Sequence, residues 1–122
     1  GKNVILDVDT IGAMKIRALC PDATLIYILP PSWDELKSRL SSTGIYTEEE
    51  VNALMEIAEE EISCANSYDY ILVNDTISNT LSHFAQIIHS NRYSRNCMKE
   101  FLDSYIDGEV KPHVQSYKEA LL

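Results

Sequence analysis

The chain has 122 residues, of which 45% are hydrophobic and 24% charged, the balance of a single globular domain rather than of a disordered or membrane-embedded chain. Its formal net charge of -9 opposes binding to nucleic acid and to anionic lipid. No apolar run approaches the roughly 20 residues that span a bilayer. We therefore expect neither nucleic acid nor a membrane as a partner.

Strands and helices are predicted to alternate along the first part of the chain. Val4 to Asp9 is a short apolar run, rich in β-branched residues, that predicts a buried parallel strand. A helix is expected from about Gly12, and Thr24 to Leu29 predicts a second buried strand. The segment from Ser32 to about Leu40 opens with the Ser-x-x-Glu pattern of a capping box, which predicts a helix.

The alternation continues in the rest of the chain. Thr47 to Glu50 has the pattern of another capping box, and the helix after it has one apolar face, formed by Val51, Leu54, Met55, Ala58, Ile62 and Ala65. Tyr70 to Val73 predicts a third buried strand. An amphipathic helix follows, with apolar residues Ile77, Leu81, Phe84 and Ile88, and a further helix is predicted from about Asn96 to Ile106. Together these segments predict an α/β fold, with a parallel sheet flanked by helices and right-handed crossovers.

Two carboxylates lie at the end of the first predicted strand. Asp7 and Asp9 occupy the place where nucleotide kinases hold Mg²⁺ through water, beside the nucleotide phosphates. The same residues can instead cap the turn that follows a strand, which is a common use of Asp. The residue pattern on its own leaves both roles open.

Several short motifs occur in a characteristic order. They are Leu6-Asp7-Val8-Asp9 with Gly12-Ala13, Leu29-Pro30-Pro31-Ser32, Leu36 with Arg39-Leu40, Thr47-Glu48-Glu49, and Val73-Asn74-Asp75. In this order and spacing the chain, from Lys2 to His89, resembles the carboxy-terminal half of a guanylate kinase. The resemblance implies a partial P-loop nucleotide-kinase-like sheet. It divides the chain into a guanylate-kinase-like region, residues 1–89, and a helical tail, residues 90–122, without a family assignment.

The resemblance also implies roles for individual side chains. Asp9 matches the acidic residue near the metal and the nucleotide phosphates, Arg39 the first arginine of the lid helix, facing the ATP phosphates, and Asn74 the position beside the adenine ring. Asp7 and Asp9 together would hold Mg²⁺ indirectly, through water. Each residue has a structural alternative: capping for the two aspartates, a solvated helix surface for Arg39, and shaping of a turn for Asn74.

Departures from the family pattern imply a loss of phosphoryl transfer. Two further lid arginines of the family correspond to Thr43 and Leu54 here, and the loss of such a cation typically costs about 10³ or more in rate. The sequence contains no G-x-x-x-x-G-K-S/T motif to cradle phosphates, and nothing in it resembles the region that grips GMP. The family phosphorylates GMP to GDP with ATP and Mg²⁺. For this chain we expect a truncated homologue, a pseudoenzyme with no catalytic residues and no cofactor.

Two other functions remain open. One is a protein-interaction module, because guanylate-kinase-like domains that have lost catalytic groups bind protein ligands. The other is a catalytic half that works when the missing amino-terminal half is supplied. In the resembled fold the P-loop strand lies between the strands predicted at Val4 to Asp7 and Leu25 to Leu29. Its absence is expected to leave open strand edges, where another chain or the missing half would bind.

The three cysteines indicate the compartment. Cys20, Cys64 and Cys97 are widely spaced and include no Cys-x-x-Cys pair. This pattern favours reduced thiols and a cytoplasmic location over a disulfide framework or a zinc site. The first residue is Gly1 instead of Met, so we expect the sequence to be trimmed or to be a piece of a longer chain.

Overall fold

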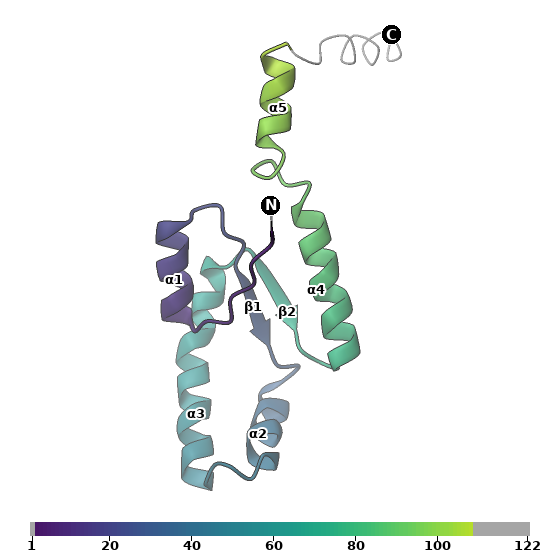
Figure 1. The fold of residues 1–122 in the computed structure, drawn as a ribbon. Helices are drawn as coiled ribbons and strands as arrows, with labels where there is room; N and C mark the ends of the chain where they lie inside the picture. The colour runs from purple at the N-terminus through teal and green to yellow at the C-terminus, as the bar shows by residue number, and fades with distance from the viewer. Residues whose placement is uncertain (1, 109–122) are drawn as a thin grey trace. The chain divides into compact units, whose positions relative to one another are not determined.

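The computed structural model describes residues 2–108 (Figure 1). In chain order its elements are α1 (Thr10–Leu19), β1 (Ile26–Leu29), α2 (Trp33–Ser42), α3 (Glu48–Glu61), the 3-10 helix η1 (Ile62–Ser67), β2 (Tyr70–Val73), α4 (Ile77–Asn91) and α5 (Lys99–Ile106). The chain divides into two compact units, one up to Ala85 and one from Gln86 onward, and the division falls within α4. Residues 109–122 of the predicted tail lie outside the described residues.

The strands β1 and β2 form a two-stranded parallel sheet, drawn as the pair of arrows in Figure 1, with Leu29 opposite Val73. Backbone hydrogen bonds continue the pairing beyond both ends. The carbonyl of Leu25 accepts from the amide of Tyr70 at 3.1 Å, and the carbonyl of Leu29 accepts from the amide of Asn74 at 2.7 Å. The predicted α/β fold, a parallel sheet flanked by helices, is confirmed.

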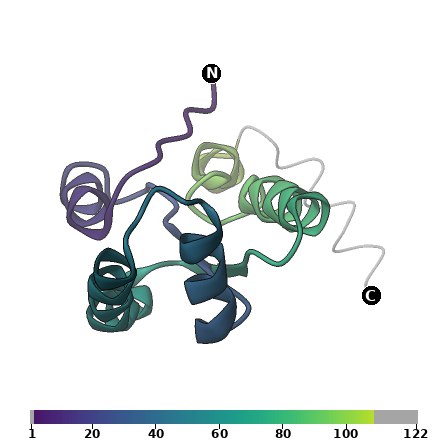
Figure 2. The same cartoon turned by 90° about the horizontal axis from the view of Figure 1, so that it is seen from below.

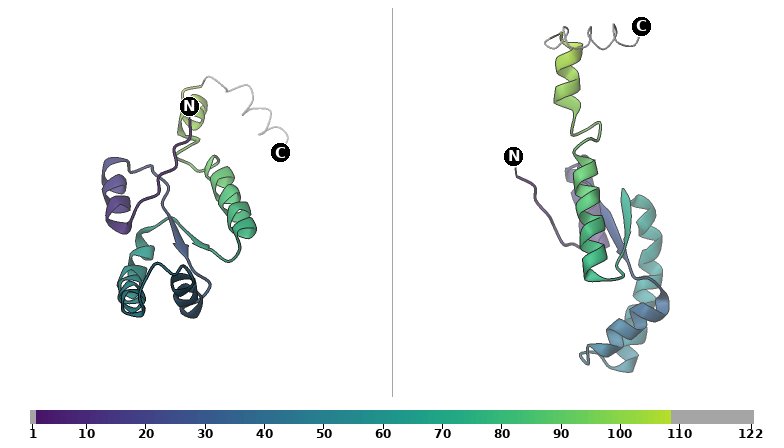
Figure 3. Two further views of the ribbon diagram at one scale, coloured as in Figure 1. Left: turned by 60° about the horizontal axis from the view of Figure 1, so that its bottom comes forward. Right: turned by 90° about the vertical axis from the view of Figure 1, so that its right-hand side faces the viewer.

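The first predicted strand is wrong. Val4 to Asp9 belongs to no strand, and within residues 2–108 the sheet consists of β1 and β2. Figure 3 shows this segment as irregular coil that lies outside the pair of strands. Its apolar side chains are open to solvent, and Val4 is 78% exposed. A strand needs a neighbour that takes up its backbone hydrogen bonds, and the described residues place no paired strand beside this segment.

Asp9 begins a helix instead of ending a strand. Its Oδ1 accepts a hydrogen bond from the amide of Gly12 at 2.7 Å, which makes Asp9 the N-cap of α1. A Cβ atom at Gly12 would lie 3.0 Å from that oxygen and 3.1 Å from the Cβ of Val8. A larger residue at this position would therefore crowd the capping oxygen and Val8. The next residue, Ala13, is 1% exposed and anchors the helix in the core.

Asp69 joins the end of α1 to the beginning of both strands. Its Oδ2 accepts from Nη2 of Arg17 at 2.6 Å and from the amide of Leu25 at 2.7 Å. The amides of Asp69 and Tyr70 in turn donate to the carbonyl of Leu25. These bonds fix where the parallel pairing of the two strands begins.

The helices α2 and α3 pack against each other, and Figure 2 shows them side by side. Both predicted N-caps are present: Oγ of Ser32 accepts from the amide of Glu35 at 3.1 Å, and Oγ1 of Thr47 accepts from the amide of Glu50 at 3.2 Å. The α3 capping box is complete, because Oε2 of Glu50 accepts from the amide of Thr47 at 2.8 Å. In α2 the Glu35 carboxylate accepts from Arg39 instead.

The predicted apolar face of α3 is turned inward. Val51 is 2% exposed, and the next apolar positions are half-buried: Leu54, Met55, Ala58 and Ile62. The α-helix ends at Glu61, earlier than predicted, and the chain continues as η1, in which Ala65 is buried.

The second unit is helical over much of its described part. It contains the last turns of α4 and all of α5, which begins at Lys99, slightly later than predicted. Within α5 the rings of Phe101 and Tyr105 meet edge to face at 5.2 Å, and Nζ of Lys99 lies 2.7 Å from Oδ2 of Asp103. Within residues 2–108, each helix is too short or too polar to span a lipid bilayer.

Candidate functional site

Arg39 lies on α2 and reaches the turn that follows β2. Its Nε donates to Oε1 of Glu35 at 2.8 Å. Nη1 donates to the carbonyl of Asn74 at 2.7 Å, and Nη2 donates to the carbonyl of Asp75 at 3.0 Å. The structure therefore brings two of the predicted site residues, Arg39 and Asn74, into direct contact. The solvated-surface alternative for Arg39 does not describe a side chain with three internal hydrogen bonds.

Asn74 connects β2 to the beginning of α4. Its amide donates to the carbonyl of Leu29, and its Oδ1 accepts from Oγ1 of Thr80 at 3.0 Å. These are contacts of a residue that shapes a turn. A place beside an adenine ring stays a prediction for Asn74.

Asp75 is a neighbouring acid that the sequence reasoning did not single out. Its Oδ1 accepts from the amide of Thr76 at 2.6 Å, and its Oδ2 accepts from Nδ2 of Asn79 at 3.2 Å. These two hydrogen bonds, that from Thr76 first, hold the pKa of the Asp75 carboxyl below its ordinary value. The capping bond at the start of α4 comes from Thr76, whose Oγ1 accepts from the amide of Asn79 at 3.2 Å, and Asp75 lies one residue before it.

The remaining predicted site residues, Asp7 and Asp9, are exposed and lie before and at the start of α1. Oγ1 of Thr10 donates to Oε1 of Glu61 at 3.4 Å, which places this helix start beside the end of α3. The Asp9 carboxylate is used as a cap. Among residues 2–108 no group of three or more His, Cys, Asp or Glu side chains is placed to hold a metal ion. Indirect binding of Mg²⁺ by Asp7 and Asp9 through water stays a prediction, and we assign the ion no step.

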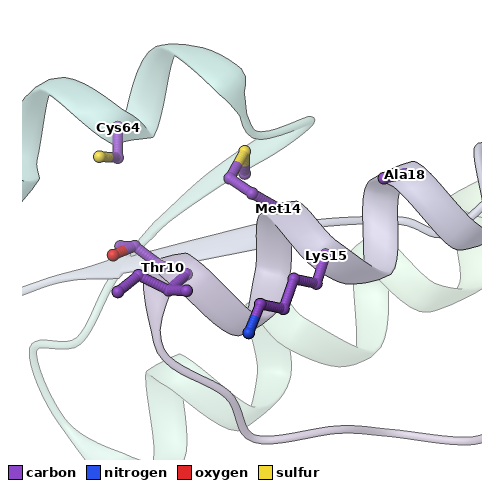
Figure 4. Close-up of a pocket in the computed structure, with 6 residues that line it drawn as sticks. Thr10, Met14, Lys15, Ala18 and Cys64 are labelled. Carbon is purple, nitrogen blue, oxygen red and sulfur yellow. The ribbon is translucent and has the colours of Figure 1, made fainter.

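A shallow apolar hollow lies between α1 and η1 (Figure 4). Its volume is about 450 Å³, and its lining consists of Thr10, Ile11, Met14, Lys15, Ala18 and Cys64. The sequence reasoning did not predict it, because the apolar residues of α1 are too few to define a face. Its lining offers little hydrogen-bonding chemistry for orienting a ligand.

Two tyrosines pack together next to Cys64. The rings of Tyr27 and Tyr68 meet edge to face at 5.0 Å. Burial, and then the negative charge of Glu61, raises the pKa of Tyr27. Burial, and then the nearby Cys64, raises the pKa of Tyr68. Both shifts keep the phenols neutral, and the contact between the two rings is one of packing.

Arg39 and Asn74 meet at the carboxyl ends of the two parallel strands. In open parallel sheets ligands bind outside these ends, where the loops gather. The fold is therefore of the α/β class with a parallel sheet, and two of the predicted site residues lie at the carboxyl edge of that sheet.

Comparison with known proteins identifies the family within this class. The family model "Guanylate kinase" matches residues 1–91, and the chain belongs to the guanylate kinase family. It is 46% identical over 92 residues to a guanylate kinase of Francisella tularensis subsp. tularensis, covering 75% of this chain and 48% of the relative. It is 36% identical over 118 residues to that of Clostridium acetobutylicum (96% and 55%). It is 36% identical over 103 residues to a guanylate kinase of Thermus thermophilus, covering 84% of this chain and 47% of the relative. The chain spans about half the length of these relatives.

Proposed function

We propose that this chain is the part of a guanylate kinase that contacts the adenine nucleotide, and that it does not transfer phosphoryl groups on its own. The observation that carries the proposal is the contact of Arg39 with the Asn74 turn. Nε and both terminal nitrogens of this guanidinium already donate to Glu35 and to two backbone carbonyls. Phosphorylation of GMP by ATP is the activity of the family. We propose that this chain descends from such an enzyme and does not carry out the reaction on its own.

Two substituted positions support the loss of transfer. The resemblance places lid arginines at Thr43 and Leu54. Oγ1 of Thr43 donates to the carbonyl of Leu40 at 2.8 Å, and Leu54 is half-buried on the apolar face of α3. Neither position offers the positive charge that stabilises a phosphoryl group in transfer. We propose no resident cofactor, and a cytoplasmic location in keeping with three free thiols.

A coupled assay for GDP tests this proposal. The purified chain is incubated with GMP, ATP and Mg²⁺, alongside the Arg39→Ala and Lys37→Ala variants; Lys37 is an exposed cation of the same helix. The expected result is the same background rate in all three samples. GDP formation that follows the chain through purification and is lost in Arg39→Ala alone would overturn the proposal.

A protein-interaction role is the second candidate, and it includes docking of a missing amino-terminal half. The observation that favours it is the open edge of β1, together with the exposed apolar segment at Val4 to Val8. Unpaired strand edges bind added strands through main-chain hydrogen bonds. An interaction module would bind another protein at this edge, whereas a catalytic half would bind the amino-terminal half of a guanylate kinase.

A further inference from the structure

We propose that Arg39 is a positioning residue, which acts on a bound nucleotide by holding the Asn74–Asp75 turn and not by binding phosphate. This inference rests on the proposed function, in which the turn lies beside the adenine ring. It assigns Arg39 a role different from the phosphate contact that the family resemblance implies.

The first argument is the geometry of the guanidinium. Its two terminal nitrogens donate to the carbonyls of two consecutive residues, Asn74 and Asp75, at 2.7 and 3.0 Å. A planar fork suits such a pair of acceptors, whereas the ammonium group of a lysine is a point charge on a flexible stem. The contact is therefore specific to arginine and joins α2 to the turn after β2.

The second argument is charge. The Glu35 carboxylate lies 2.8 Å from Nε of Arg39 and is the acidic partner of this ion pair. A phosphate would have to compete with this carboxylate and with two carbonyl oxygens for the same guanidinium. A residue committed in this way is a weak phosphate ligand and an effective brace.

The third argument concerns what the brace holds in place. The amide of Asn74 donates to Leu29 and its Oδ1 accepts from Thr80, so both the backbone and the side chain of Asn74 are oriented. Within residues 2–108 the Nδ2 group of Asn74 makes no hydrogen bond. It is a donor fixed at the carboxyl edge of the sheet, suited to a ring nitrogen of a purine.

Two probes separate a brace from a phosphate ligand. Adenosine carries the base without phosphate, and inorganic triphosphate carries the phosphates without the base. Both are titrated into the full chain and into Arg39→Ala, Arg39→Lys and the control Lys37→Ala, with amide NMR shifts as the readout. We expect both Arg39 variants to weaken adenosine binding about tenfold, the effect of one lost charged hydrogen bond, and to leave triphosphate binding unchanged.

The opposite pattern would overturn the proposal. A phosphate ligand predicts weaker triphosphate binding in Arg39→Ala, rescue by Arg39→Lys because the charge is retained, and no change with adenosine. Lys37→Ala should change neither probe.

Hydrogen exchange in the absence of ligand provides the second readout. Both Arg39 variants should speed exchange of the Asn74 amide about tenfold while the amide of Leu72, a core residue, stays protected and shows that the chain is folded. Unchanged exchange at Asn74 in both variants overturns the brace. If the unmodified chain binds neither probe, the proposed nucleotide contact fails, and the exchange result still decides whether Arg39 holds the turn.

Discussion

Asp75 illustrates how an exposed side chain can stabilise the beginning of a helix. Its carboxylate accepts from the amide of Thr76 and the side chain of Asn79, and these bonds lower its pKa. A carboxyl whose pKa is lower in the folded state than in the unfolded state stabilises the fold above the unfolded pKa. That stabilisation is lost as the pH falls through the folded pKa. Solvent and salt reduce the effect because the group is exposed.

The first residue-scale prediction is therefore a pH-dependent effect of Asp75→Asn. The variant should be less stable than the unmodified chain at neutral pH, and the two stabilities should converge at an acidic pH below the lowered pKa of Asp75, where its carboxyl has taken up a proton. Urea unfolding at both pH values measures the difference, with Asn52→Ala, an exposed change on α3, as the control. An NMR titration that places the Asp75 midpoint at or above the ordinary aspartate value would contradict the prediction.

Single residues also show which parts of the site the sequence could reveal. The cap at Asp9 depends on residues close in the chain, and the turn-capping alternative anticipated that kind of role. The contact between Arg39 and Asn74 joins positions far apart in sequence, and no local pattern encodes such a pairing. The pairing of Glu35 with Arg39 lies at helical i, i+4 spacing and was predictable in principle, but the capping-box pattern assigned Glu35 to another partner.

At the scale of elements, α3 is stabilised by its capping box and by its buried apolar face. Its start has reciprocal side-chain bonds between Thr47 and Glu50, and its first apolar residue, Val51, is buried. Three acidic residues occupy its first turn, Glu48, Glu49 and Glu50. Their negative charges interact favourably with the positive end of the helix dipole. A helix of this kind depends measurably on its cap.

We expect Thr47→Ala to lower the free energy of unfolding by about 1 kcal/mol, because the amide of Glu50 loses its acceptor. Thr47→Ser keeps a hydroxyl oxygen and is the matched control, with stability close to that of the unmodified chain. Urea unfolding followed by circular dichroism measures both. Equal losses in the two variants would show that the methyl group, and not the cap, accounts for the effect.

Elements with strong local signals were predictable, and those that need distant partners were not. The caps and apolar face of α3 lie within a single segment, so its sequence is sufficient to predict it. Val4 to Asp9 has the composition of a strand but no paired neighbour in residues 2–108. The apolar face predicted for α4 begins with Ile77, which is 79% exposed. In both cases the pattern describes a surface suited to burial, and burial itself depends on what covers it.

At the scale of the whole molecule, much apolar surface lies uncovered beside a small core. Within residues 2–108 the buried apolar side chains are Ala13, Leu25, Val51, Ala65 and Leu72. Exposed apolar residues occur on most elements, and those on the strands and on the segment before α1 include Val4, Ile5, Leu6, Ile28 and Ile71. Exposed apolar surface of this kind is typical of an interaction site.

Both strands have an open outer edge, and the backbone shows which residues face it. Leu25 and Leu29 direct their carbonyls toward β2, so by the alternation of a parallel ladder Ile26 and Ile28 direct their amides and carbonyls to the opposite edge of β1. By the same alternation Ile71 faces the far edge of β2. Ile28 is 53% exposed and Ile71 is 56% exposed, so the two positions form a matched pair.

The last prediction uses this pair to test docking of the missing half. Proline removes the amide donor and disrupts added strand pairing, but at these outward positions it spares the bonds between β1 and β2. The chain is mixed with the amino-terminal part of the Clostridium acetobutylicum guanylate kinase, and association is measured by sedimentation. We expect binding by the unmodified chain and by Ile71→Pro, and binding at least about tenfold weaker for Ile28→Pro. Exchange of the Ile26 amide should slow on binding, because that amide gains an acceptor.

Loss of binding in Ile71→Pro alone would place the docking edge on β2. An absence of association in every sample would exclude this half as the partner, and the interaction-module function would then be favoured.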